Sequence, residues 1–232
     1  MAWIRYLAYL LGFAVVTALL TQLEAAHPGS LRLQVFTGPA DTLGTSEFSP
    51  LETIQLVVLL ACGGMMAWVA QHCLQQRPLA FLFGGLALAF LIRELDYFLD
   101  RNVADNFWQV LIAIVAALLI AYVYRNRRRV QIALARSWPS PGLTLLYAGA
   151  LVLFVFSLLI GHEPLWQSIF GDEYRRSAKI AIEEFIELIG YALWFIGTIE
   201  YTYQARAAAL AEPEPVVKRR RRHQRDRRKG SY

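Results

Sequence analysis

Six long apolar stretches constrain this chain more than any other feature of its sequence. Each approaches or exceeds the roughly 20 residues that a helix needs to cross a hydrocarbon core about 30 Å thick. Of the 232 residues, 56% are hydrophobic, and they are concentrated in these blocks. We therefore predict an all-α integral membrane protein, a bundle of six transmembrane helices. The predicted spans are residues 3–23, 51–74, 79–99, 107–124, 143–160 and 180–203.

The first apolar stretch, Trp3–Leu23, shares one feature with a secretory signal peptide, because Arg5 precedes its apolar part. It is longer than a usual signal core, however, and it lacks the small residues of a cleavage site at its end. We expect an uncleaved helix. The polar segment that follows predicts an exposed loop, in which Leu31–Gly38 forms a short strand or lies against the bundle. In the second span, Gly63 and Gly64 predict the close approach of a neighbouring helix.

Basic residues are distributed unequally between the two sides that six spans define. One side collects Arg5, Arg77, Arg125, Arg127, Arg128, Arg129, Arg136, Arg206 and the basic residues of 218–229. The other side receives Arg32, Arg101, Arg175, Arg176 and Lys179. By the positive-inside rule, both termini are cytoplasmic. We predict an N-in, C-in protein of a bacterial inner (plasma) membrane.

Two basic segments lie on the predicted cytoplasmic side. Residues 125–141 predict a strongly basic loop between the fourth and fifth spans. Residues 207–232 predict a disordered tail, because they contain too few apolar residues to fold alone. A basic segment tethered to a membrane helix favours contact with anionic lipid headgroups, each basic residue contributing about 1 kcal/mol. We therefore expect membrane lipids rather than nucleic acid as its partner. The sequence does not give an oligomeric state.

The sixth apolar stretch carries an unusual stripe of acidic side chains. At about 100° per residue, Glu183, Glu184 and Glu187 fall with Tyr191 inside one arc of the helix. Ionisable groups at membrane depth are costly and normally face the interior of a bundle or a wet cavity. The stripe therefore predicts a polar site between helices, to which Trp194 on the same face also contributes.

Residues from three other elements are expected at the same depth. Glu52 begins the second span, the segment Arg93–Arg101 ends the third, and His162 follows the fifth. All of them lie toward the non-cytoplasmic side in the predicted topology. Within the third-span segment, the candidates are Arg93, Glu94, Asp96, Tyr97 and Asp100. Four elements distant in sequence thus bring carboxylates to one layer.

Several carboxylates in a low-dielectric layer require a compensating proton or cation. Oxygen ligands suit divalent ions such as Mg²⁺, Ca²⁺ or Mn²⁺, so we predict a divalent metal ion held by Glu94, Glu184 and Glu187. In the same interpretation, the catalytic residues are Glu52, Arg93 and His162. Further site residues are Glu183, Asp96, Asp100, Tyr97 and Tyr191. HExxH, GxSxG and P-loop motifs do not occur in the sequence.

Three classes of function fit this layer. The first is a metal-dependent intramembrane enzyme that acts on a lipid-like substrate from the non-cytoplasmic side. The second is a cation- or proton-coupled transporter or channel that uses the same carboxylates as its coupling site. The third is a non-catalytic subunit in which an interhelical salt bridge joins Arg93 to Glu184 or Glu187. We rank the enzyme first.

Overall fold

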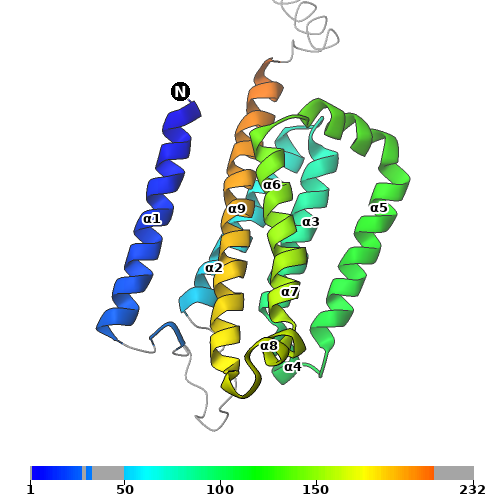
Figure 1. Cartoon of the computed structure of the whole chain (residues 1–232). Coiled ribbons are helices and arrows are strands. Elements are labelled where there is room, and N and C mark those ends of the chain that lie inside the picture. Colours follow the sequence, from blue (N-terminus) through cyan, green and yellow to red (C-terminus); the bar gives the residue numbers. More distant parts are fainter. Residues whose placement is uncertain (1, 28–29, 33–49, 212–232) are drawn as a thin grey trace, which may run out of the picture.

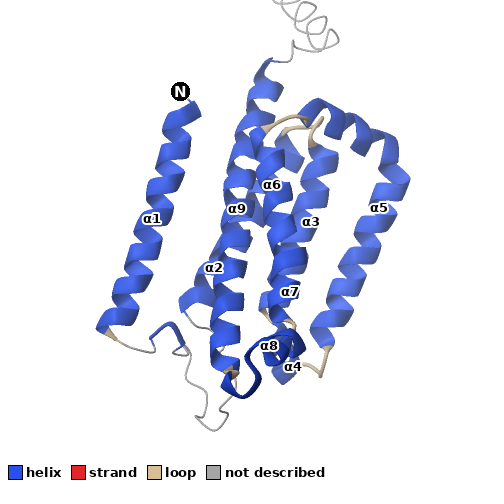
Figure 2. Ribbon diagram, viewed as in Figure 1, coloured by secondary structure: helices blue, strands red, loops and turns tan. Residues whose placement is uncertain are grey.

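The computed structural model describes residues 2–27, 30–32 and 50–211, and every regular element in these ranges is helical (Figures 1 and 2). In chain order the elements are α1 (Ala2–Ala26), η1 (Ser30–Arg32), α2 (Pro50–His72), α3 (Arg77–Glu94), α4 (Asp96–Asn102), α5 (Phe107–Ser137), α6 (Pro141–Leu151), η2 (Val152–Phe156), α7 (Ser157–Gly161), α8 (Glu163–Phe170), η3 (Gly171–Glu173) and α9 (Arg176–Ala211). The predicted all-helical class is confirmed for the described ranges. Most of the strand predicted over Leu31–Gly38 lies outside them, and Ser30–Arg32 form a 3₁₀ turn.

Within the described ranges, four helical segments are long and apolar enough to cross a membrane. They are α1, α2, α5 and the continuous run from α6 through η2 to α7. The pair α3 and α4 makes a fifth if it counts as one span, with a bend of 60° between its halves. The remaining long helix, α9, has 36 residues, but it carries four glutamates and does not belong to that apolar group. The predicted membrane-spanning character is confirmed at this level.

Helices α6 and α9 pack most closely, and glycines make this approach possible. A Cβ atom on Gly149 would lie 2.8 Å from the backbone nitrogen of Trp194, and one on Gly197 would lie 2.7 Å from that of Leu146. Small residues bring helix backbones together in this way where packing, rather than exclusion of water, drives association. The predicted close approach at Gly63 and Gly64 is wrong, because a Cβ atom there would have no neighbour within 4 Å.

The hydrophobic core of the bundle lies where α2 and α3 pack against α9. Trp194 is buried and stands edge-on to Phe83 and Phe90, with ring centroids 5.9 and 5.4 Å apart. Tyr201, seven residues further along α9, donates a hydrogen bond of 2.9 Å to Gln76 in the turn before α3. Edge-to-face aromatic pairs add about 0.5–1.5 kcal/mol each beyond the area they bury. These contacts make α9 the central helix of the bundle.

Helix α1 stands at the side of the bundle and exposes most of its apolar residues (Figure 1). Its polar contacts with the bundle converge on Glu200 of α9, which is fully buried. Arg5 donates to both carboxylate oxygens at 2.8 and 3.0 Å, and Tyr9 donates at 2.9 Å. The start of α1 therefore lies at the same end of the molecule as the end of α9.

Helix α5 continues well beyond the predicted fourth span. The sequence predicts a basic loop after Tyr124, but the chain stays helical to Ser137 with a single irregular residue, Asn126. Its second half lies across the end of the bundle (Figure 1). Val130 and Ala133 are the residues of this helix that are buried. Alternation of arginines with apolar residues at helical spacing explains why this segment folds rather than remaining a loop.

Helix also occurs in two segments outside the predicted spans. The polar segment between the fifth and sixth spans contains α8, and its Trp166 and Phe170 rings stack with centroids 5.8 Å apart. At the C-terminus, α9 extends to Ala211, so the first residues of the predicted tail are helical. The rest of that tail, 212–232, lies outside the described residues.

Candidate functional site

A polar cavity of about 290 Å³ lies at the end of the bundle opposite the start of α1. Side chains from α2, α3, α4, α8 and α9 surround it. Its lining residues are Glu52, Arg93, Glu94, Asp96, Phe98, Glu163, Arg176, Lys179, Ile180, Glu183, Glu184 and Glu187. Seven of these are carboxylates and three are cations, so the cavity carries an excess of acidic groups.

The break between α3 and α4 supplies the first two site residues. Arg93 and Glu94 are the last residues of α3, and the chain turns at Leu95, whose N–H donates to Ile92 O at 3.2 Å. A helix C-terminus favours cations and disfavours anions. Arg93 is therefore well placed on its own helix, whereas Glu94 requires a partner from another element. That partner is Tyr191 of α9, whose hydroxyl donates to Glu94 Oε1 at 2.5 Å.

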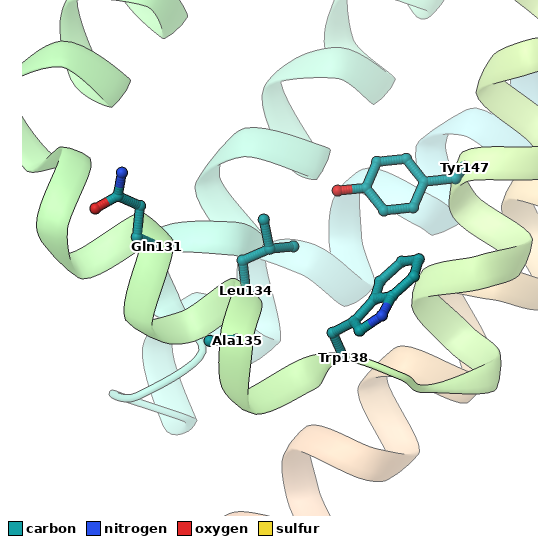
Figure 3. Close-up of a pocket in the computed structure, with 5 residues that line it drawn as sticks. All are labelled: Gln131, Leu134, Ala135, Trp138 and Tyr147. Atoms are coloured by element: carbon teal, nitrogen blue, oxygen red, sulfur yellow. The ribbon is translucent and has the colours of Figure 1, made fainter.

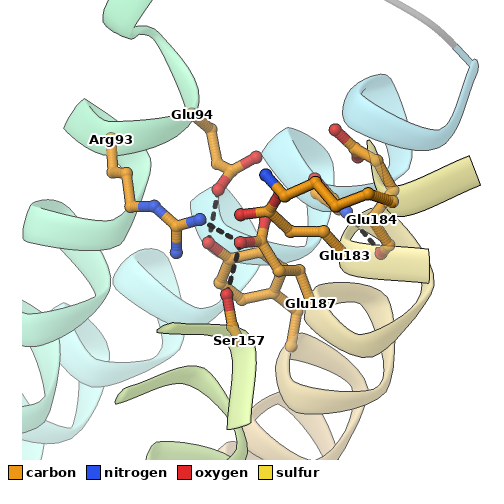
Figure 4. Close-up of polar contacts among 9 residues, drawn as sticks. Arg93, Glu94, Ser157, Glu183, Glu184 and Glu187 are labelled. Carbon is orange, nitrogen blue, oxygen red and sulfur yellow. Dashed lines mark hydrogen bonds and ion pairs between the residues drawn. The ribbon is translucent and has the colours of Figure 1, made fainter. Parts of the chain in front are cut away.

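Glu187 forms the centre of the cavity's inner wall (Figure 4). Only 4% of this residue is exposed, and its Oε1 atom accepts from both Arg93 and Ser157. Ser157 Oγ lies 2.6 Å from that oxygen and is itself buried. Three helical segments, α3, α7 and α9, thus meet at one carboxylate. The salt bridge between Arg93 and Glu187 is present; it is one of the two pairings named for the third class of function, the non-catalytic subunit.

Ser157 reaches Glu187 because of an irregular turn in its own helix. Between α6 and α7 the chain forms a π-helical segment, η2, in which the Ser157 N–H donates to the carbonyl of Val152 five residues earlier. A π turn accommodates one residue more than an α turn and occurs frequently at functional sites. It changes the direction in which every later side chain of that helix points.

Glu184 differs from its neighbours, because one of its oxygens is buried without a partner. The atom Oε2 accepts no hydrogen bond, and Gln55 of α2 contacts only the backbone carbonyl of Glu184, at 3.4 Å. The carboxylates of Glu52 and Glu187 lie close enough to interact electrostatically with it. A buried polar atom without a partner is rare and requires an explanation. Here the simplest is a proton, water or cation in the cavity.

The first turns of α9 supply two of the three cations of the cavity. Lys179 donates to Glu183 at 2.6 Å, one turn later on α9. Arg176, in the first turn of α9, is exposed. Glu163, the first residue of α8, lines the cavity with them. Basic and acidic side chains therefore alternate along this part of the cavity.

Most of the residues that the sequence places in this layer do converge here. Seven candidates line the cavity: Glu52, Arg93, Glu94, Asp96, Glu183, Glu184 and Glu187. Tyr191 is buried beside it and reaches it through Glu94.

Three candidates lie elsewhere. His162 is exposed at the start of α8. Asp100 accepts from the backbone N–H of Phe107 at 3.2 Å and so supports the start of α5. The Tyr97 hydroxyl accepts a hydrogen bond of 3.0 Å from Arg101, one turn later. None of these three belongs to the residues that line the cavity.

Four polar residues of the site do not appear in the sequence-based prediction: Glu163, Arg176 and Lys179, which line the cavity, and Ser157, the hydrogen-bond partner of Glu187 behind it. The spacing of Lys179 and Glu183, four residues apart on a helix, is a signal that sequence reasoning can use. Ser157 gives no such signal, because its direction depends on the π turn.

The donor side chains of the cavity meet only part of what a metal ion requires. Within residues 2–27, 30–32 and 50–211, no three acidic, histidine or cysteine side chains are arranged as a preformed metal site. Mg²⁺, however, is commonly held by one or two carboxylates, with waters and substrate phosphates completing its shell. Glu184, with its unpartnered oxygen, and Glu52 fit that smaller requirement.

Comparison of the chain with family models, curated proteins and solved structures gives no match. The chemistry of the cavity therefore has to be inferred from its own geometry.

Proposed function

We propose that this chain is a six-span protein of a bacterial inner membrane with both ends in the cytoplasm, α9 being the sixth span. Two observations support this arrangement. Glu187 and Glu200 of α9 are buried inside the bundle, so neither charge would face lipid. The end of the molecule that contains the start of α1 also carries the arginines of the second half of α5, in agreement with the positive-inside rule.

In this topology, the acidic cavity opens toward the non-cytoplasmic side. We propose that it is the active site of a metal-dependent membrane enzyme that acts on a lipid-like substrate with an anionic headgroup. The observation that carries the proposal is the buried, unpartnered oxygen of Glu184 in a cavity with four more carboxylates than cations. Glu184 and Glu52 would hold the ion, which when bound would polarise a substrate oxygen or activate water.

The remaining residues have distinct tasks in this proposal. Arg93 fixes Glu187 in the inner wall, and Ser157 donates to the same oxygen and so prevents its rotation. Lys179 and Arg176 line the cavity, and Arg176 is exposed, so their charges would attract an anionic headgroup. Tyr191 holds Glu94 toward the cavity, where this carboxylate is positioned to accept a proton. Residues 212–232 lie outside the described residues, and their contact with anionic headgroups remains part of this proposal.

Binding of Mn²⁺, measured by electron paramagnetic resonance on the purified full chain in detergent, tests the metal site. We expect Glu184→Gln to weaken Mn²⁺ binding by at least about tenfold and Glu52→Gln to do likewise. Glu173→Gln is the matched control, because Glu173 is exposed and lies outside the cavity. Equal Mn²⁺ affinity in the wild type and Glu184→Gln would contradict the proposal. Hydrolysis of a panel of phospholipids by the same variants then tests the reaction.

A cation- or proton-coupled transporter is the second candidate, because one observation favours it. Beyond the cavity, α9 carries three further buried polar atoms without a hydrogen-bond partner: Trp194 Nε1, Thr198 Oγ1 and Thr202 Oγ1. Ordered waters satisfy such atoms in many proteins, and a line of waters would connect the cavity with the opposite end. Flux of protons or cations into liposomes containing the protein, abolished in Glu184→Gln, would favour transport over an enzyme.

A further inference from the structure

The second half of α5 combines an exposed basic face with an open apolar groove. After Asn126 leaves helical geometry, Arg127, Arg128 and Arg129 follow in sequence, and all three are exposed. Val130 and Ala133 are buried against the bundle. The helix is fixed in place by Ser137, whose hydroxyl donates to Gln76 at 2.9 Å. It is therefore an ordered basic helix that lies across one end of the bundle.

The groove lies between this helix and α6 (Figure 3). It has a volume of about 670 Å³ and is lined by Gln131, Leu134, Ala135, Trp138 and Tyr147. Trp138 and Tyr147 are 57% and 45% exposed, and their ring centroids are 6.1 Å apart. Exposed Trp and Tyr residues of this kind are typical of the interface between membrane and water.

Two of the arginines share the face of the groove. At 100° per residue, Arg127 and Arg128 lie within about 60° of Gln131 around the helix, on either side of it. Arg129 points away from the groove by the same measure. Arg136 is already engaged, since it donates to Gln75. The groove therefore has cations near one end and two aromatic rings at the other.

We propose that this groove binds an anionic phospholipid of the surrounding membrane. Its phosphate contacts Arg127 and Arg128, and an acyl chain lies along Leu134 and Ala135 toward Trp138 and Tyr147. Charge complementarity selects the anionic headgroup, and the apolar lining excludes a free phosphate ion as the preferred ligand. This inference requires that the chain is embedded in a membrane, but it does not depend on the reaction proposed for the acidic cavity, at the other end of the bundle.

Native mass spectrometry of the full chain tests the proposal, with phosphatidylglycerol, phosphatidylcholine and inorganic phosphate as probes. We expect retention of phosphatidylglycerol in preference to the other two. Arg127→Gln/Arg128→Gln should weaken its binding by about tenfold. Arg125→Gln/Arg129→Gln is the matched control, because it removes the same charge at two positions off the groove: Arg129 points away from it, and Arg125 lies before the break at Asn126. Ala135→Phe should also weaken binding, since it fills the groove without changing the charge.

Three results would overturn the proposal. Equal losses in the two arginine pairs would indicate general attraction to a basic surface. Equal retention of phosphatidylcholine, or displacement of the lipid by inorganic phosphate, would exclude recognition of an anionic lipid. A dimer that disappears in Ala135→Phe would show that a second copy of the chain occupies the groove instead.

Discussion

Both ends of α9 bury a carboxylate, but the two ends differ in how fully its charge and hydrogen bonds are satisfied. Near its C-terminal end, Glu200 is fully buried, but Arg5 and Tyr9 supply three hydrogen bonds to its oxygens. Near its N-terminal end, Glu187 shares one arginine with a cavity that contains six other carboxylates, and Glu184 retains an unpartnered oxygen. A fully hydrogen-bonded network stabilises a structure, whereas the unpartnered oxygen at the N-terminal end is the basis for the ligand that we propose there.

The largest expected effect follows removal of the cation from the unbalanced end. Arg93→Ala leaves Glu187 buried without its ion-pair partner, which we expect to lower the free energy of unfolding by about 3 kcal/mol. Chemical denaturation in detergent micelles measures this change. The double variant Arg93→Ala/Glu187→Gln should recover most of the stability, because the uncompensated charge is then absent. Failure of this recovery would show that Arg93 contributes mainly through packing.

A smaller and more local effect is expected at the balanced end. Arg5→Ala removes the charged contact between α1 and the bundle, so α1 should detach while the other helices remain folded. Hydrogen exchange should increase over residues 3–26 and remain unchanged in α6. Arg206→Ala is the matched control, because this arginine is exposed at the same end. Unchanged exchange in Arg5→Ala would show that lipid packing alone retains α1.

Replacement of Glu184 should change the stability in the opposite direction from replacement of Arg93. Because this carboxylate contributes to an excess of negative charge without forming a side-chain hydrogen bond through its buried oxygen, Glu184→Gln should stabilise the protein by about 1 kcal/mol. Thermal unfolding in the absence of divalent ions measures it. Glu187→Gln should destabilise in the same assay, because Arg93 then loses its partner. Destabilisation of both variants by equal amounts would contradict an unbalanced site.

The smallest expected effect concerns the interior between the two ends. Thr198→Val removes a buried hydroxyl that has no hydrogen-bond partner and keeps nearly the same volume. The protein should gain up to about 1 kcal/mol of stability if the hydroxyl is dry, because a buried hydroxyl without a partner is unfavourable. A loss of stability would indicate an ordered water at Thr198 and would strengthen the transport interpretation. Thermal unfolding distinguishes a dry hydroxyl from one that binds an ordered water, with Thr144→Val at an exposed position as the control.

The sequence predicts much of this site because a helix converts sequence position into depth. The rise of 1.5 Å per residue is enough to place Glu52, Glu94 and Glu184 in one layer, and the cavity contains all three. It does not determine which helices are neighbours within the membrane plane. Glu200 illustrates this limit, since its partner Arg5 lies 195 positions away in the sequence and belongs to a helix that otherwise contacts little of the bundle.

The errors have local causes. The basic loop expected after Tyr124 is a helix because its apolar residues recur at helical spacing and Ser137 anchors it to Gln76. Exposed His162 illustrates a different limit, because a residue just beyond a helix takes its direction from a turn that composition does not specify. Gly63 and Gly64 show that a pair of small residues permits a close approach but does not cause one.

The π turn at η2 makes the length of this helix matter as much as its composition. If this turn became a regular α-helix with all of its residues retained, every later position would rotate by about 100°. Ser157 would then no longer face Glu187, although no contacting side chain had been replaced. Loss of one residue between Val152 and Phe156 would have the opposite consequence: it would remove the extra residue and leave Ser157 facing Glu187 across a regular α-helix. The contact therefore depends on the extra residue being held in a π turn.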